Sequence, residues 1–450
     1  MDINKLFIEK MLYPAMEKLK GNKIRLYVSD LVKTQSFSAD ELKKLQKDRL
    51  AELLYYCHDN VPAYRGLDPA LIEKDPYEAL TSLPLLSKDE FNSDPEKYLS
   101  SAFPKDQRIP NLTGGSTGVP THFFMSRGQV EQYEAARWRG LSWYGISFGS
   151  RSVMVWGSHI ELDKAAQASY SRKEKLLKNR MVIPAFDITS SNAKKYVDFL
   201  NAYKPEYIYG YASSLAAFAK IIEAYGKEKL KLKLKAVIST SETLTEEYAG
   251  IIKRVFECPV GNEYGARDAG ILAYSCPMGH LHVSYENAVI EVLDPITKTP
   301  VKPGQSGVLA VTDLGSRAQP RLRWLLGDMG TLSPESCGCG ISLPVFSSLD
   351  GREDSMLVGA NGRLIHGHMP NQIIRDYTQI RQFRFVQKTP DTALLMLECD
   401  PDPALAEEII AKINAVEPSW KISYEFTDNI PLPSSGKLRA SVREFPLSEN

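Results

Sequence analysis

The sequence predicts a multi-layer α/β protein: a large N-terminal domain with a β-rich subregion, and a small α+β C-terminal domain joined to it by a hinge. Between residues 108 and 350, short β-rich runs alternate with amphipathic helical stretches, which favours parallel strands connected by helices. Residues 276–345 instead combine strand and turn signals with little helical periodicity, which indicates an antiparallel region. The remaining chain is long enough for a small core of its own. We therefore expect domains at 1–350 and 351–450.

The expected elements follow in chain order. Leucines recur at helical spacing within residues 45–64, and Pro62 ends that helix. Ser87, three residues before Glu90, marks the capped start of another helix. The β-rich runs of the large domain are 152–157, 207–212, 235–240 and 307–314. In the small domain, strands are expected at 382–387, 392–400 and 422–428, with a helix near 403–415.

Composition narrows the class of protein. Hydrophobic residues make up 43% of the 450 residues and charged residues 24%, the balance of a globular protein. The 55 Lys and Arg residues equal the 55 Asp and Glu residues, so net charge attracts neither nucleic acid nor an anionic membrane. The chain has no apolar run long enough to span a membrane, no signal-peptide core, and too few cysteines for a disulfide framework. We expect a cytoplasmic enzyme.

The glycine-rich segment 111–123 is the first candidate for chemistry. Its glycines permit backbone conformations that other residues resist, and successive backbone N–H groups can form an anion-binding nest beside several hydroxyls. Because no Gly-Lys-Ser/Thr ending follows, it is not a Walker-type loop. An ordinary turn between strands is the alternative. The residues of this phosphate-loop candidate are Thr113, Gly114, Gly115, Ser116, Thr117, Gly118 and Thr121.

The segment 262–270, with the sequence NEYGARDAG, suits the edge of a nucleotide. Tyr264 can stack on a base, and Asp268 can hold Mg²⁺ or orient a phosphate. A polar loop with a local ion pair between Arg267 and Asp268 explains the same residues equally well.

Two single residues are weaker candidates. Asp328 follows a strand-like segment in a Gly-Asp pair, where a carboxylate can accept both hydroxyls of a ribose, although most such pairs are simple turns. Lys437 lies in a small polar loop near the C-terminus and can be delivered to a phosphate as a mobile charge. The alternative for Lys437 is an ordinary solvated lysine.

Cysteine and histidine residues form two glycine-flanked half-sites that predict a zinc subregion over 276–339. Cys276 precedes His280 by four residues, and Cys337 and Cys339 close a second loop. Three thiolates and one imidazole make a closed tetrahedral site, which is structural because no position is left for a reacting water. His282 is an alternative ligand. Ordinary thiols and a surface histidine are the alternative to a metal site.

Taken in order, these segments resemble the adenylate-forming superfamily of acyl-CoA synthetases, nonribosomal peptide adenylation domains and luciferases, in particular the branch of phenylacetate–CoA ligase and CapK-type proteins. The resemblance covers most of the chain, and it depends on the order of the motifs more than on any one of them. The matching segments are 45–65, 83–91, 112–121, 210–220, 238–244, 262–270, 322–330, 351–354 and 431–440.

The resemblance implies an ATP- and Mg²⁺-dependent activation of a carboxylic acid as an acyl-adenylate, followed by rotation of the small domain and transfer of the acyl group, usually to coenzyme A. It also implies roles for single residues. The phosphate loop would hold the β- and γ-phosphates, and Lys437 would bridge the substrate carboxylate and the α-phosphate. The other implied positions are Ser241, Glu242, Tyr264 and Gly265 at the adenine, Asp268 at the magnesium ion, Arg267 beside the adenylate, Asp328 and Arg352 at the ribose, and Asp354 at the hinge.

The chain departs from the common family pattern at two places. The segment Tyr264-Gly265-Ala266-Arg267-Asp268 replaces Tyr-Gly-x-Thr/Ser-Glu, so the acidic arm is one methylene shorter and direct magnesium ligation is in doubt. The phosphate loop ends in Pro-Thr where many relatives have Pro-Lys, which removes one cation. Transfer of the acyl group to an amine or a sugar hydroxyl, as a CapK-like variant, and a non-catalytic nucleotide-binding role therefore stay open as alternatives.

The acyl pocket is expected from aromatic residues that suit an aryl or other flat acid, namely Trp143, Tyr144, Trp156 and Tyr211. Packing in the protein core is an equal alternative for each of them. The expected partners are small molecules: the acid, ATP and coenzyme A. No nucleic acid or membrane is expected, and a homodimer is left open.

Overall fold

The structure, a computed structural model, describes residues 3–113, 121–156, 174–365, 367, 369–374, 377, 379–430 and 440–445. A mixed sheet of 11 strands forms its centre, and a separate four-stranded sheet lies near the C-terminus. The predicted α/β class is therefore confirmed. Among the described helices, none is both long and apolar enough to cross a membrane.

The N-terminal region is helical, as expected from its leucine spacing. Ser38 begins the longest helix: its hydroxyl accepts a hydrogen bond from the Glu41 backbone N–H, and the Glu41 carboxylate accepts from the Ser38 N–H. Ser87 likewise accepts from the Glu90 N–H, at the predicted helix start. The helices are α1 (Ile3–Phe7), α2 (Tyr13–Lys20), α3 (Ile24–Thr34), α4 (Ala39–Asn60), α5 (Pro69–Lys74), α6 (Pro76–Thr81) and α7 (Lys88–Ser93), with a π-helical turn at Ile8–Leu12.

Five neighbouring strands of the main sheet are parallel, in the order β4-β3-β5-β6-β7. Helices make the crossovers, as the alternation of strand and helix signals predicts. Their apolar faces and the strands bury one continuous core. The strands are β3 (Ser152–Trp156), β4 (Arg180–Pro184), β5 (Tyr207–Tyr211), β6 (Ala236–Thr240) and β7 (Val260–Ala266); the helices are α10 (Ala193–Tyr203), α11 (Ala212–Gly226) and α12 (Glu246–Phe256).

The remaining strands of the main sheet are antiparallel, in the order β8-β9-β13-β12-β11-β10, which confirms the expected antiparallel region. Strands β9 and β13 have only two residue pairs in register, Val345 with His282 and Phe346 with Leu281, and this seam divides the main sheet into two halves. One half holds β10, β11, β12 and β13, and the other holds β9, β8, β7, β6, β5, β3 and β4. The strands are β8 (Gly270–Ser275), β9 (Leu281–Val283), β10 (Ala288–Leu293), β11 (Ser306–Asp313), β12 (Trp324–Leu332) and β13 (Val345–Arg352).

A C-terminal unit follows β13 and has its own buried core, which includes Leu357, Phe385, Leu395 and Trp420. Its sheet has the order β18-β17-β16-β19. The boundary at 350/351 stays a prediction. The elements are β14 (Leu357–Val358), β15 (Leu364–Ile365), α13 (Met369–Ile374), β16 (Gln382–Thr389), β17 (Thr392–Glu398), α14 (Pro403–Val416), β18 (Lys421–Phe426) and β19 (Ser441–Arg443).

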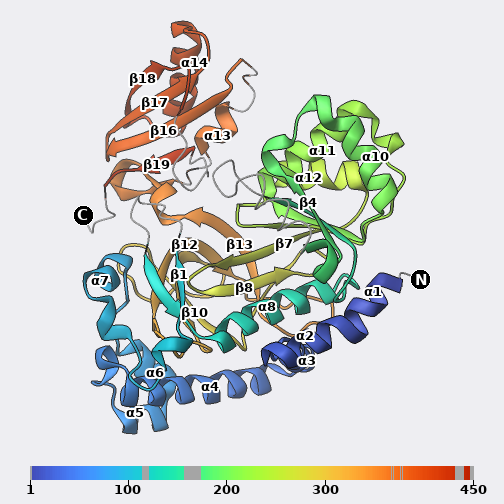
Figure 1. Cartoon of the computed structure of the whole chain (residues 1–450). Coiled ribbons are helices and arrows are strands. Elements are labelled where there is room, and N and C mark those ends of the chain that lie inside the picture. Colours follow the sequence, from blue (N-terminus) through green and yellow to red (C-terminus); the bar gives the residue numbers. More distant parts are fainter. Residues whose placement is uncertain are drawn as a thin grey trace.

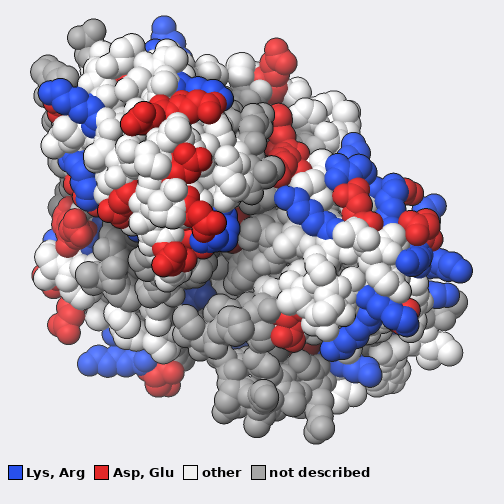
Figure 2. Space-filling model, turned by 90° about the horizontal axis from the view of Figure 1, so that it is seen from above, with Lys and Arg blue, Asp and Glu red and all other residues white. Residues whose placement is uncertain are grey.

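Two units stand on the same side of the main sheet (Figure 1). One is the C-terminal unit, and the other carries α10, α11 and α12. The N-terminal helices run along the opposite side, with α8 (Arg127–Ser142) between them and strands β7 and β8. Figure 2 looks down on the side with the two units: the surface is hollowed between them, acidic side chains are frequent on the C-terminal unit, and Lys and Arg are frequent on the other.

A buried ion pair joins the N-terminal helices to the sheet. Arg139 of α8 donates from Nη1 to Oε1 of Glu286 at 2.6 Å, and the side chains are 1% and 0% exposed. The same oxygen accepts from the hydroxyl of Thr34, at the end of α3. The Glu286 carboxylate therefore contacts two segments that are far from it in the sequence. Because it is buried, removal of its charged partner would leave a costly unpaired charge.

Candidate active site

The candidate active site lies where the parallel strands end. Trp156, Tyr211 and Thr240 are the last residues of β3, β5 and β6, and Tyr264 lies near the end of β7. The carboxyl ends of parallel strands share one edge of a sheet, and open α/β sheets bind their ligands at that edge. The topology thus brings the segments around 211, 240 and 264 together, as a site for one ligand requires.

Hydrogen bonds join the two ends of the phosphate-loop candidate. A hairpin of β1 (Ile109–Leu112) and β2 (His122–Met125) leads into and out of the loop. At its base, the Thr113 N–H donates to the Thr121 carbonyl and the Thr121 N–H donates to the Thr113 hydroxyl, both at 3.0 Å. The Thr121 hydroxyl is buried with no hydrogen-bond partner among the described residues. Gly114, Gly115, Ser116, Thr117 and Gly118 lie outside the described residues.

Three residues predicted from separate motifs lie together. The Tyr264 hydroxyl donates to Oδ2 of Asp328 at 3.0 Å, and Arg352 Nη1 donates to Oδ1 of the same carboxylate at 2.8 Å. Burial, with Asp328 close by, raises the pKa of Tyr264 well above its usual value, so this hydroxyl remains a donor. Gly327 has a φ of 74°, and a Cβ there would lie 2.7 Å from Arg352 Nη2. Glycine is therefore required for the arginine to lie against β12.

The two residues that follow this tyrosine turn point in different directions. Asp268 is buried, and its Oδ2 accepts from the indole N–H of Trp324 at 2.9 Å, while its backbone carbonyl accepts from Arg321. One of the two carboxylate oxygens is thus engaged within the protein. Arg267 is exposed.

The segment after β6 has a strained turn. Ser241 has a φ of 66°, a left-handed conformation that few non-glycine residues adopt. Glu242 then accepts from the Ser213 N–H at 2.9 Å, within the first turn of α11. This hydrogen bond ties the segment predicted to line the adenine to the helix that follows β5.

The four aromatic residues predicted for the acyl pocket make different contacts. Trp156 and Tyr211 stack with ring centroids 4.2 Å apart at the carboxyl edge of the sheet. Trp143 instead packs edge-on against His282 at 5.5 Å, and the Tyr144 hydroxyl donates to the Ser275 carbonyl. These two side chains lie beside β8 and β9, but they share one hydrophobic cluster with Trp156, so their place in the acyl pocket stays a prediction.

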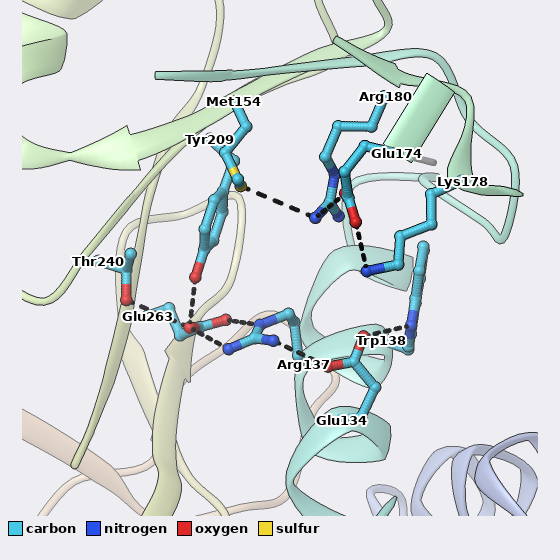
Figure 3. A network of polar contacts seen from close by, with 10 residues as sticks. All are labelled: Glu134, Arg137, Trp138, Met154, Glu174, Lys178, Arg180, Tyr209, Thr240 and Glu263. Atoms are coloured by element: carbon cyan, nitrogen blue, oxygen red, sulfur yellow. Dashed lines mark hydrogen bonds and ion pairs between the residues drawn. The ribbon is translucent and has the colours of Figure 1, made fainter. Parts of the chain in front are cut away.

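A charged network lies beside this edge (Figure 3) and escaped prediction from the sequence. The Glu263 carboxylate, 1% exposed, accepts from Arg137 Nε at 2.9 Å and Nη2 at 3.1 Å, and from the hydroxyls of Tyr209 and Thr240. Arg137 also donates to Glu134 at 2.8 Å. Burial alone would lower the pKa of Arg137, but Glu263, Tyr209 and Glu134 outweigh it and hold that pKa well above its usual value.

A second, separate set of polar contacts lies beside this network, at the start of β4. Arg180 contacts Glu174 at 3.4 Å and the sulfur of Met154 at 3.8 Å, and Lys178 contacts Glu174 at 2.9 Å. One sign of this network was available in the sequence, because Glu263 directly precedes Tyr264. Alternate residues of a strand face opposite sides of the sheet, so the charge of Glu263 lies on the face opposite to Tyr264. Its partner Arg137 is 126 residues away, which no local pattern reveals.

The predicted cysteine half-sites come together, with one change of ligand. The atoms that Cys276, His282, Cys337 and Cys339 can offer to a metal all lie within 4.8 Å of one another. The predicted His280 is exposed, with its Nδ1 3.1 Å from Cys337 Sγ, outside this group of four. The structure therefore favours His282, the alternative, because strand β9 directs it inward.

Two of the predicted residues cannot be placed as side chains. Asp354 lies in a single 3-10 turn at Glu353–Ser355, directly after β13, and its side chain lies outside the described residues. Lys437 lies in the segment 431–439, which is also outside them. Their roles stay predictions.

Sequence comparisons identify relatives across most of the chain. Protein CapK of Staphylococcus aureus is 24% identical over 423 residues, 90% of each protein. Phenylacetate-coenzyme A ligase of Thermus thermophilus is 25% identical over 334 residues, 72% of this chain and 73% of that enzyme. These relatives agree with the resemblance that the motifs predict, to the branch of phenylacetate–CoA ligases and CapK-like proteins of the adenylate-forming superfamily. No family model matches the chain.

Solved structures of adenylate-forming ligases share the fold. A 2-hydroxyisobutyryl-CoA ligase in its postadenylation state superposes with a TM-score of 0.68 over 91% of each chain, at 19% identity. The anthranilate CoA ligase AuaEII superposes with a TM-score of 0.50 over 74% of this chain and 66% of its own, at 15% identity. The chain thus shares the fold of these ligases.

Proposed function

We propose that the chain activates a carboxylic acid with ATP as an acyl-adenylate and transfers the acyl group to coenzyme A. The observation that carries the proposal is the group of Tyr264, Asp328 and Arg352. It offers a ring, a carboxylate and a guanidinium at the carboxyl edge of the sheet, groups that suit an adenosine and its phosphates.

The proposed chemistry has two steps. A carboxylate oxygen of the acid forms a bond to the α-phosphorus of ATP, and the bond to the leaving pyrophosphate breaks. Positioning and charge neutralisation carry most of the catalysis in such a transfer. We assign neutralisation to Lys437 and the phosphate loop, with Asp268 near a Mg²⁺ ion that the phosphates themselves would largely hold. In the second step the thiol sulfur of coenzyme A bonds to the acyl carbon, its proton is released, and AMP leaves.

A difference between two states of one relative supports rotation of the C-terminal unit. The 2-hydroxyisobutyryl-CoA ligase with coenzyme A in its thioesterification state superposes with a TM-score of 0.56, against 0.68 in the postadenylation state, at the same 91% coverage. Both are states of the same enzyme, so we attribute the difference to the arrangement of its parts, and this attribution supports the proposed rotation.

The acid is proposed to be flat and to carry a hydrogen-bonding group. The stacked rings of Trp156 and Tyr211 offer a flat apolar wall. Tyr209 stacks at 6.0 Å on Trp156, and its hydroxyl donates to Glu263, so the same wall continues into the charged network. A hydrogen-bonding substituent of the acid would meet this charged network.

ATP–pyrophosphate exchange across aryl, hydroxyaryl, aminoaryl, fatty, amino and sugar acids tests the proposal. We expect acid-dependent exchange, strongest for substituted aryl acids, and AMP release that requires coenzyme A. AMP release with an amine or sugar acceptor instead would favour the CapK-like alternative, to which the 90% coverage of CapK lends support. Tight binding of ATP without exchange for any acid would contradict adenylation and indicate a non-catalytic nucleotide-binding relative.

Replacement of Asp328 with alanine is expected to weaken ATP binding by about 10- to 100-fold, because hydrogen bonds to a charged acceptor contribute roughly 1.5–3 kcal/mol. The carboxylate also positions Tyr264 and Arg352. Isothermal titration calorimetry measures the affinity. The control is Asp350→Ala on β13, whose carboxylate accepts from Ser306. An equal loss of affinity in both variants would show that Asp328 has no specific role.

A further inference from the structure

Four soft metal ligands lie at the junction between the two halves of the main sheet. Cys276 follows β8 and His282 lies in β9, whereas Cys337 and Cys339 lie in the loop 333–344 that leads into β13. Cys276 and His282 are 0% exposed. All six cysteines of the chain are free thiols, so no disulfide ties these segments together.

The distances suit a tetrahedral zinc site. Cys276 Sγ and Cys337 Sγ are 3.9 Å apart, and Cys339 Sγ and His282 Nε2 are 3.3 Å apart. Zinc bonds of about 2.3 Å to sulfur and 2.0 Å to nitrogen place two ligand sulfurs about 3.8 Å apart and a sulfur and a nitrogen about 3.5 Å apart. A separation of 3.9 Å is almost twice the length of a disulfide bond, which is about 2.05 Å.

A backbone carbonyl outside the four ligands orients His282. His282 Nδ1 lies 3.0 Å from the carbonyl oxygen of Leu343. A proton on Nδ1 satisfies this contact and leaves the lone pair of Nε2 directed at the sulfurs, which is the arrangement usual for zinc-binding histidines. His280 has an exposed ring instead. Strand β9 thus distinguishes two histidines that are only two residues apart.

We propose that Cys276, His282, Cys337 and Cys339 bind one Zn²⁺ ion, and that this ion clamps the two halves of the main sheet. The strand pair β9–β13 has only two residue pairs in register, fewer than any other neighbouring pair in that sheet among the described residues. Two ligands belong to each side of this seam. The ion is structural, because three thiolates and one imidazole leave no open position.

The clamp also bears on the nucleotide site, and this part rests on the proposed function. Tyr264 comes from one half of the sheet, on β7, and its partner Asp328 comes from the other, on β12. Phe346, at the seam itself, packs edge-on against the ring of Tyr264 at 6.0 Å. Loosening the seam therefore moves Tyr264 relative to Asp328.

Metal analysis of the purified full chain tests the site without any substrate. We expect about one zinc per chain by inductively coupled plasma mass spectrometry. Titration of the native protein with a mercurial, followed with a zinc-sensitive dye, should release that zinc as about three thiols react. Absence of zinc in protein prepared without chelators, or the same amount of another metal, overturns the proposal.

The two neighbouring histidines supply a matched pair of variants. His282→Ala should lose the zinc and lower Tm, whereas His280→Ala should keep both unchanged. If His282→Ala does not fold, the mercurial titration of the unmodified protein still decides. Zinc that is lost in His280→Ala and retained in His282→Ala overturns the ligand set. ATP binding is then compared before and after zinc release. Weaker binding after release supports an effect of the zinc site on the nucleotide site. Unchanged binding means that the zinc ion stabilises the fold alone.

Discussion

Replacement of Lys437 with alanine is expected to reduce acid-dependent ATP–pyrophosphate exchange by about 100- to 1,000-fold, the effect of removing one charged or hydrogen-bonding group that faces charge developing in a transition state. As the acid attacks, negative charge gathers between its carboxylate and the α-phosphate. An ammonium group delivered there by the C-terminal unit neutralises that charge in the first step only. ATP binding, measured by calorimetry, should change little, since most of its contacts come from the large unit.

Two controls make this prediction specific. Lys421→Ala removes an exposed lysine from β18 of the same C-terminal unit, where its contact with Asp391 is 3.8 Å long, and should leave exchange unchanged. Synthetic acyl-adenylate supplied with coenzyme A should still yield thioester in the Lys437→Ala variant, because the lysine serves adenylation. Near-native exchange in that variant would refute the role assigned to Lys437.

Replacement of Arg139 with methionine is expected to lower the free energy of unfolding by about 3–5 kcal/mol, the usual cost of leaving one partner of a buried ion pair uncompensated. Glu286 would keep its charge at 0% exposure, with only the Thr34 hydroxyl left as a side-chain donor to Oε1. Methionine has a similar length and is flexible, so the lost charge dominates over lost packing. Urea unfolding followed by tryptophan fluorescence measures the change.

A surface pair provides the comparison for Arg139. Arg254 makes two hydrogen bonds to Glu223, at 2.7 and 2.9 Å, but this pair lies on the outer face of α11 and α12, where solvent screens it. Arg254→Met should therefore leave stability almost unchanged. The double variant Arg139→Met with Glu286→Gln should recover much of the loss, because no charge is then left buried. Equal effects of Arg139→Met and Arg254→Met would contradict the prediction.

Local patterns were sufficient for most elements and for the order of the motifs. Leucine spacing predicted helix α4, the capping Ser87 predicted the start of helix α7, and runs of β-branched and aromatic residues predicted strands β3, β5, β6 and β11. These signals work because a helix or strand buries one face at a period of 3.6 or 2 residues, which the sequence shows directly. The motifs likewise placed Tyr264, Asp328 and Arg352 in one site before any contact between them was visible.

The sequence by itself determined the α/β class, the resemblance to the adenylate-forming superfamily and the residue types available for chemistry. Tertiary structure alone decided which of these residues meet. It favoured His282 over His280 and paired Arg137 with Glu263 and Arg139 with Glu286. The reason is physical: periodicity and capping act within a few residues, whereas the neutralisation of a buried charge depends on a partner that only the folded chain brings near.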